Sequence, residues 1–84
     1  MVTVLLAPDA QAEFAKLPAT MQVRVAAVFE RLKAWPSVSG AKPLRGALAG
    51  TYRIRTGDWR VLFRFVAPTI VVVRIAHRSQ VYED

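Results

Sequence analysis

Arginine side chains alternate along residues 51–65, which read TYRIRTGDWRVLFRF. The Gly57-Asp58 pair predicts a two-residue turn between two strands, so that Arg55 lies opposite Arg60. Directly opposed residues share a face of a sheet, and side chains alternate between faces along each strand. One face should therefore carry Arg53, Arg55, Arg60 and Arg64, and the other Tyr52, Ile54, Val61, Phe63 and Phe65.

Such a face could bind phosphate, because the planar fork of arginine suits phosphate oxygens. The alternative is a solvated outer face of the sheet without a binding role, since arginine is common on such faces. A surface that serves only solubility mixes both signs of charge, whereas Asp58 of the turn is the one acid in this segment. We therefore expect a phosphate-binding face, and we assign the binding of RNA or ribosome to its surrounding cations, Lys42, Arg45, Arg64 and Arg74.

The end of the chain adds side chains that could move protons. Its final residues, HRSQVYED, contain His77, Arg78 and Tyr82. A histidine exchanges its proton near neutral pH, and a tyrosine can do so when cations favour its phenolate. Each is a weak signal alone, since a lone histidine is more often structural. Beside the arginines they indicate phosphoryl chemistry without a metal, because no carboxylate cluster could hold Mg²⁺, and we expect no cofactor.

The elements that must position these side chains follow from the hydrophobic pattern. Strands are expected over residues 2–6, 51–56, 59–66 and 70–76, and helices over 8–17 and 19–35, with a loop over 36–50. Prolines end both helices. The 84 residues should form one domain of the α+β class, with a helix hairpin on one face of a four-stranded, mainly antiparallel sheet in the order β-α-α-β-β-β.

The last hairpin has two possible registers. A three-residue loop, 67–69, would place Arg74 opposite Leu62 on the basic face and put Val71, Val73 and Ile75 in the core. A two-residue loop would direct Arg74 towards the core, where an unpaired charge is costly. We therefore expect the three-residue loop, which leaves the direction of His77 open.

Composition narrows the class of protein. A hydrophobic content of 54% argues against disorder, and the net charge of +6 favours a polyanionic partner. Residues 42–84 hold eight basic and three acidic residues, so most of the excess lies with the predicted strands. Without cysteine, signal peptide or membrane-length apolar run, the chain is expected to act in the cytoplasm and away from membranes.

The residues match a known family. The segments KPLRGALAGTYRIRTGDWRVLFRF and VVVRIAHRSQVYED resemble the RelE/ParE superfamily of toxins from type II toxin–antitoxin systems, over essentially the whole chain. The ending HRSQVY is similar to the RelE branch, whose members are ribosome-dependent mRNA endonucleases. The ParE branch, whose members poison DNA gyrase, usually lacks this histidine–tyrosine ending.

The resemblance implies roles for particular residues. The basic pair of the family falls on Arg53 and Arg55, the arginine at the scissile phosphate on Arg60, and the C-terminal tyrosine on Tyr82. The hypothesis is mRNA cleavage in the ribosomal A site by attack of the ribose 2′-OH on the adjacent phosphate. Tyr52 should face the core, so Tyr82 is expected to be the base, with His77 or Arg78 as proton donor or phosphate clamp.

The resemblance also implies a cognate antitoxin, for which we expect a small protein with an acidic, amphipathic segment. Two other functions remain open at the level of sequence. One is a ParE-like inhibitor of DNA gyrase without nuclease activity. The other is a small basic protein that binds RNA or ribosomes and catalyses nothing.

Overall fold

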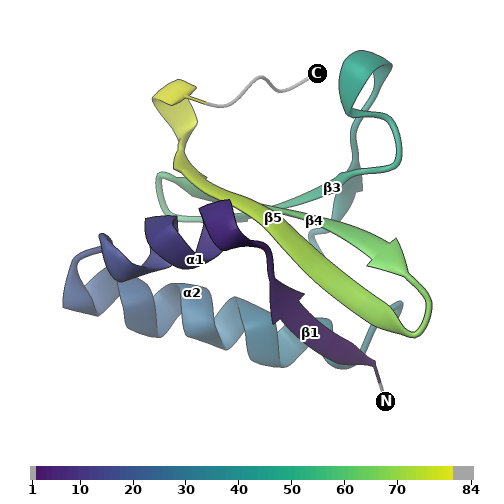
Figure 1. The fold of residues 1–84 in the computed structure, drawn as a ribbon, viewed down its shortest axis with the longest axis horizontal. Helices are drawn as coiled ribbons and strands as arrows, with labels where there is room; N and C mark the ends of the chain where they lie inside the picture. The colour runs from purple at the N-terminus through teal and green to yellow at the C-terminus, as the bar shows by residue number, and fades with distance from the viewer. Residues whose placement is uncertain (1, 81–84) are drawn as a thin grey trace.

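Within residues 2–80, which the computed structural model describes, two α-helices lie against one face of a five-stranded sheet (Figure 1). The sheet order is β1-β5-β4-β3-β2, in which β1 pairs parallel with β5 and the other neighbours pair antiparallel. The strands are β1 (Thr3–Leu6), β2 (Lys42–Pro43), β3 (Tyr52–Thr56), β4 (Trp59–Val66) and β5 (Thr69–His77). The short helical turns η1 (Gly46–Leu48) and η2 (Arg78–Gln80) rise from the sheet on the side away from the helices (Figure 1).

The predicted class and element order are confirmed, with one strand more than expected. The additional strand is β2, which pairs with β3 through Lys42↔Arg53 and Pro43↔Tyr52. It lies in the segment predicted as a loop, since two residues containing a proline give no strand signal. A proline is compatible with this place because β2 is at the edge of the sheet.

Prolines mark the start of both helices. Pro8 is the first residue of α1 (Pro8–Ala15), and Pro18 directly precedes α2 (Ala19–Leu32). The first turn of a helix tolerates proline because the missing N–H would have no partner there. Both helices are shorter than predicted, because their last turns tighten; the N–H groups of Ala34 and Trp35, for example, bond three residues back, to the carbonyls of Arg31 and Leu32.

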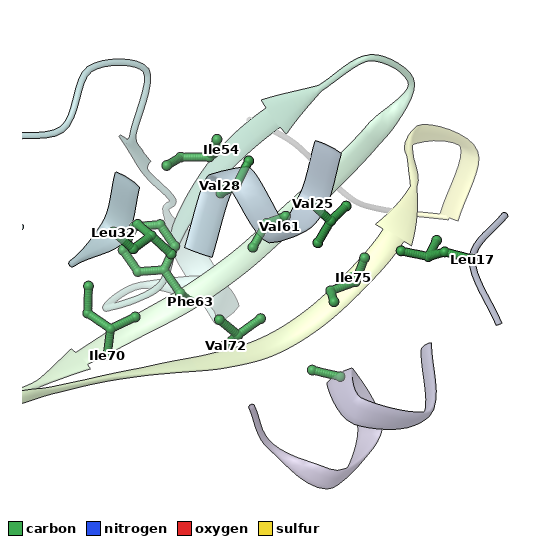
Figure 2. Packing of buried hydrophobic residues seen from close by; sticks show 11 residues of the cluster. Leu17, Val25, Val28, Leu32, Ile54, Val61, Phe63, Ile70, Val72 and Ile75 are labelled. Atoms are coloured by element: carbon green, nitrogen blue, oxygen red, sulfur yellow. The ribbon is translucent and has the colours of Figure 1, made fainter. Parts of the chain in front are cut away.

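The core lies between the helices and the sheet. In Figure 2, Val25, Val28 and Leu32 of α2 point towards Val61 and Phe63 of β4. Trp35 packs edge-on against Phe63 and Tyr52, with ring centroids 5.3 and 4.9 Å apart. The helices and the residues just after them contribute buried or partly buried side chains to this core, namely Ala10, Phe14, Leu17, Met21, Val25, Val28, Leu32 and Trp35.

Two phenylalanines of β4 differ in burial and allow a matched test. Phe63 is fully buried, whereas Phe65, which was also expected in the core, is 39% exposed at the edge of the Trp35 cluster. We expect Phe63→Ala to lower the free energy of unfolding by about 3–5 kcal/mol, a large part of the stability of a domain of this size. Phe65→Ala should cost clearly less in the same urea titration. Equal losses would contradict the burial difference between the two rings.

The β4–β5 hairpin combines a feature of each register considered from the sequence. Its turn has two residues, Ala67 and Pro68, because Val66 pairs with Thr69. An irregularity between Leu62 and Phe63 then leaves Val73 without an opposite residue, so that Leu62 still lies opposite Arg74. The predicted three-residue loop is therefore wrong, whereas the predicted Leu62–Arg74 pair is confirmed.

This bulge changes which residues of β5 reach the core. Ile70, Val72 and Ile75 are buried, whereas Val71 and Val73 are only partly so. The expectation that Val71 and Val73 fill the core is wrong, because the inserted residue reverses the alternation of faces on one side of it.

In the part of the chain that the structure describes, no helix is long and apolar enough to cross a membrane.

Candidate nucleic-acid interface

The face of the sheet opposite the helices carries the predicted cations in two adjacent rows. In one row, Lys42 of β2 lies opposite Arg53 of β3. In the next row, Arg55 of β3 lies opposite Arg60 of β4. Ile54 lies between these arginines in sequence and packs in the core on the other face. The prediction that Arg53, Arg55 and Arg60 share the face away from the core is confirmed; we call it the arginine face.

Two of these arginines are buried rather than solvated. Arg53 is 5% exposed and Arg60 is 8% exposed, while Arg55 and Lys42 are open to solvent. Leu62 lies opposite Arg53 and Ala76 opposite Arg60, and both are buried without belonging to the main core cluster. A guanidinium removed from water acts on a nearby phosphate more strongly than an exposed one, because less solvent screens the interaction.

The β3–β4 turn fixes the position of Arg60. The Arg60 Nη1 group donates to the carbonyl oxygens of Gly57 and Trp59, at 3.2 and 3.1 Å. Gly57 has φ of +61°, a left-handed conformation that a tight hairpin turn requires and glycine adopts without strain. The sequence of the turn therefore determines where the Arg60 guanidinium is held.

The same turn receives Arg78 from the end of β5. The Arg78 backbone N–H donates to the Asp58 carbonyl at 2.8 Å, and its Nε lies 3.7 Å from the Asp58 carboxylate. An exposed ion pair of this kind contributes little stability. It nevertheless brings the Arg78 side chain to the turn that also holds Arg60.

His77 lies on the other face of the sheet. It is opposite Trp59, and the two rings are perpendicular with centroids 5.5 Å apart. Trp59 packs against the core, whereas the neighbouring pair, Arg60 and Ala76, belongs to the arginine face. The Nδ1 atom of His77 accepts the Ser79 N–H at 3.2 Å and lies 2.9 Å from the Ser79 hydroxyl. The structure thus does not bring the His77 ring to the arginines.

The other predicted site residues occupy different places. Arg64 extends towards the loop before β3, where its Nη2 lies 3.4 Å from the position that a Cβ on Gly50 would take. Arg45 is exposed in the loop before η1. Arg74 turns to α1 and pairs with Glu13 at 2.7 Å, and the second oxygen of that carboxylate accepts the Ile75 N–H. Tyr82 lies outside the described residues.

The arginine face can stabilise negative charge but cannot accept a proton, because arginine stays protonated at physiological pH. Among residues 2–80, no group of three or more histidine, cysteine, aspartate or glutamate side chains is placed to hold a metal ion. A base for any reaction at this face would have to be a group other than these arginines.

Arg31 is a cation that sequence reasoning missed. It lies in α2, a helix in which no site residue was predicted from the sequence. In the structure, Arg31 lines a pocket of about 500 Å³ together with Lys42, Arg53 and Arg55. No local sequence pattern predicts that Arg31 lies near these residues, because their proximity depends on the short strand β2, which brings the chain back to β3.

Comparison with known proteins places the chain in the RelE/ParE superfamily of toxins. A chain of the toxin–antitoxin complex RelBE2 from Mycobacterium tuberculosis superposes with a TM-score of 0.80 and 35% identity, over 95% of this chain and 97% of that chain. The isolated RelE toxin of E. coli shares the fold with a TM-score of 0.77 at 16% identity, over 92% of this chain and 84% of that chain.

Residues 4–82 match the ParE toxin of type II toxin–antitoxin systems (parDE), and the chain belongs to that family. The Toxin RelG of Mycobacterium tuberculosis is 36% identical over 83 residues, which cover 95% of this chain and 94% of RelG. The resemblance expected from the arginine segment and the ending HRSQVY is confirmed at the level of the superfamily.

Proposed function

We propose that this toxin is a ribosome-dependent mRNA endonuclease that stops translation in the cytoplasm. The observation that carries the proposal is the arginine face, in which Arg55 and Arg60 are directly opposed and Arg60 is held by the Gly57 and Trp59 carbonyls. Cations fixed in advance where charge develops are among the largest contributions to catalysis.

The proposed reaction needs no group from outside the protein and the RNA. The ribose 2′-OH loses its proton to a base, and its oxygen bonds to the adjacent phosphorus. The bond from phosphorus to the 5′-oxygen breaks, and a donor protonates that oxygen, which leaves a 2′,3′-cyclic phosphate and a 5′-hydroxyl. Arg60, with Arg53 and Arg55, stabilises the charged intermediate state, and Tyr82 serves as the base.

The position of Arg78 favours it over His77 as the group that meets the leaving oxygen or clamps the phosphate. Arg78 is attached to the turn that holds Arg60, whereas the His77 ring contacts Trp59 on the helix side. Lys42, Arg45, Arg64 and Arg74 are proposed to bind RNA or ribosome around this centre. For Arg74 that contact would compete with its ion pair to Glu13.

The second candidate function is inhibition of DNA gyrase without cleavage, and the match to the ParE toxin family favours it. One experiment separates the two. Purified toxin is added to ribosomes programmed with mRNA and, in parallel, to a gyrase supercoiling assay. We expect cut mRNA with a 2′,3′-cyclic phosphate end and unchanged supercoiling. Loss of supercoiling with intact mRNA would replace the nuclease by the gyrase inhibitor, and a 3′-hydroxyl end would exclude attack by the 2′-OH.

A toxin of this kind must be held inactive, and we propose a cognate antitoxin with an acidic, amphipathic segment. Related toxins occur in complexes with an antitoxin, among them RelBE2 of Mycobacterium tuberculosis. This chain exposes apolar side chains that such a segment could cover, including Leu5, Val23 and Val66, which are 55%, 71% and 62% exposed.

The antitoxin proposal gives a measurable result. A partner that binds only the folded toxin stabilises it in proportion to the logarithm of its concentration over its Kd. Addition of the antitoxin encoded beside this gene should therefore raise the toxin's melting temperature and stop mRNA cleavage. An antitoxin that leaves both quantities unchanged at micromolar concentration would contradict the proposal.

A further inference from the structure

A basic pocket lies at the outer edge of the sheet, beside the arginine face. The pairing of β2 with β3 ends at Lys42↔Arg53, and the chain before Lys42 continues without strand pairing. The pocket, of about 500 Å³, is lined by residues from both segments and from α2. They are Arg31, Gly40, Ala41, Lys42, Arg53, Ile54 and Arg55.

The charge of this pocket has one sign. Four of its lining residues are cations, and among the described residues that line it none is acidic. A concave site lined by a single sign of charge concentrates the field and raises the local concentration of oppositely charged groups. An anion is therefore the ligand that the pocket suits.

Arg31 is positioned by the loop that follows α2. Its Nη2 donates to the Ser39 carbonyl at 2.6 Å, the one hydrogen bond that its guanidinium makes within residues 2–80. Gly40, with φ of +87°, lets the chain turn here, and a Cβ on it would lie 3.9 Å from the same Nη2. The remaining N–H groups of Arg31 can donate to a ligand while this bond holds the side chain in place.

We infer that this pocket binds a backbone phosphate of the RNA next to the one that is cleaved. The inference rests on the proposed nuclease function and extends it. Arg53 and Arg55 belong both to the arginine face and to the pocket. An RNA strand that places one phosphate at Arg60 can therefore continue along β3 to the edge of the sheet. Arg31 then contacts the substrate from the helix layer.

The pocket favours a phosphate over a carboxylate of a protein partner. Three of its four cations are arginines, whose forks bind the several oxygens of a phosphate from different sides. Its walls also continue directly into the proposed reaction centre rather than into the exposed apolar side chains. A protein carboxylate in the pocket is therefore the rival outcome of the test.

The test combines a protein variant with a chemically altered RNA. Arg31→Ala removes the cation from the pocket, and Lys16→Ala removes one exposed positive charge at the end of α1, outside the pocket lining. Each protein is titrated onto programmed ribosomes whose mRNA carries a 2′-deoxy sugar at the cleavage position. In a series of such mRNAs, one phosphate at a time is replaced by an uncharged methylphosphonate.

We expect Arg31→Ala to weaken binding to unmodified RNA about tenfold, the effect of one charge-assisted hydrogen bond, and Lys16→Ala to leave it within about twofold. One methylphosphonate next to the cleavage position should weaken the wild type by a similar factor and Arg31→Ala hardly at all. Equal effects of the two variants would overturn the inference. It would also be overturned if every methylphosphonate weakened the binding of Arg31→Ala as much as it weakens the binding of the wild type. Loss of antitoxin affinity with unchanged RNA affinity would assign the pocket to a protein carboxylate and overturn it as well.

A second measurement separates this inference from the proposed function. Inorganic phosphate is titrated into the free toxin while the amide signal of Gly40 and the Nε–H signal of Arg31 are followed by NMR. Saturable shifts, absent from Arg31→Ala, are expected even if the wild type cuts no mRNA. Suppose that the wild type cleaves mRNA, phosphate causes no NMR shift and Arg31→Ala has no effect on RNA binding. The phosphate-binding role of the pocket would then be wrong, and the nuclease proposal would stand.

Discussion

Replacement of Arg60 by alanine is expected to lower the single-turnover rate of mRNA cleavage on programmed ribosomes by about 10²–10³-fold. The reason is the position of its guanidinium, which the Gly57 and Trp59 carbonyls hold on the arginine face. A cation that needs no rearrangement during the reaction stabilises the transition state more than it stabilises bound substrate. The effect should therefore persist when toxin saturates the ribosomes.

Arg60→Ala should also cost some stability, since Arg60 is only 8% exposed. Loss of its hydrogen bonds is worth about 1 kcal/mol, which lowers the melting temperature by several degrees and leaves the protein folded at 25 °C. Arg60→Lys keeps the charge but not the fork, and we expect it to recover only part of the rate.

The matched control for the loss of one positive charge is Lys16→Ala, at the end of α1 in the helix layer. Lys16 is exposed and has no role in the proposed site. The Lys16→Ala variant should cleave mRNA at the wild-type rate. Cleavage at the wild-type rate by Arg60→Ala would show that Arg60 does not act on the phosphate. An equal loss of rate in both variants would show that the effect comes from net charge alone.

The sequence predicted the parts of this fold that depend on local chemistry. The Gly57-Asp58 turn sets the register of β3 on β4, so the opposition of Arg55 and Arg60 could be predicted from two residues. The prolines after the helices give a similar local signal, since α1 and α2 both end before the proline that follows them, Pro18 and Pro36. The turn 67–68 carries no such signal for the bulge at Val73, because a bulge responds to how the whole hairpin packs on the helices.

The burial of side chains and the contacts between residues distant in sequence could not be predicted from the sequence, for a related reason. Alternation predicts which face a side chain lies on, but not how much of that face other segments cover, so it could not indicate that Arg53 and Arg60 are buried. Arg74 was expected on the arginine face, yet its flexible side chain reaches Glu13 of α1. Arg31 joins the site through contacts with segments that follow it in sequence. These features depend on tertiary packing, which periodicity does not describe.

The second large effect is expected from Tyr82→Phe, which removes one hydroxyl and should lower the cleavage rate by about 10²–10⁴-fold with ribosome affinity nearly unchanged. The arginines can hold the phosphate but cannot take the proton of the 2′-OH, and in the proposed reaction this task falls to the tyrosine. Tyr82 lies outside the described residues, so its assignment stands on the sequence and on the chemistry that the arginine face lacks.

His77 is the rival for the same task, and the structure provides a reason to expect a small effect from it. Its ring packs on Trp59, and its Nδ1 accepts the Ser79 N–H, on the side of the sheet away from Arg60. His77→Gln should therefore keep most of the cleavage rate and lose some thermal stability. The deciding measurement is the single-turnover rate of both variants on the same programmed ribosomes, with ribosome affinity measured in parallel. Normal cleavage by Tyr82→Phe together with loss in His77→Gln would reverse the two roles, and it would require the histidine to leave Trp59 when the toxin binds its substrate.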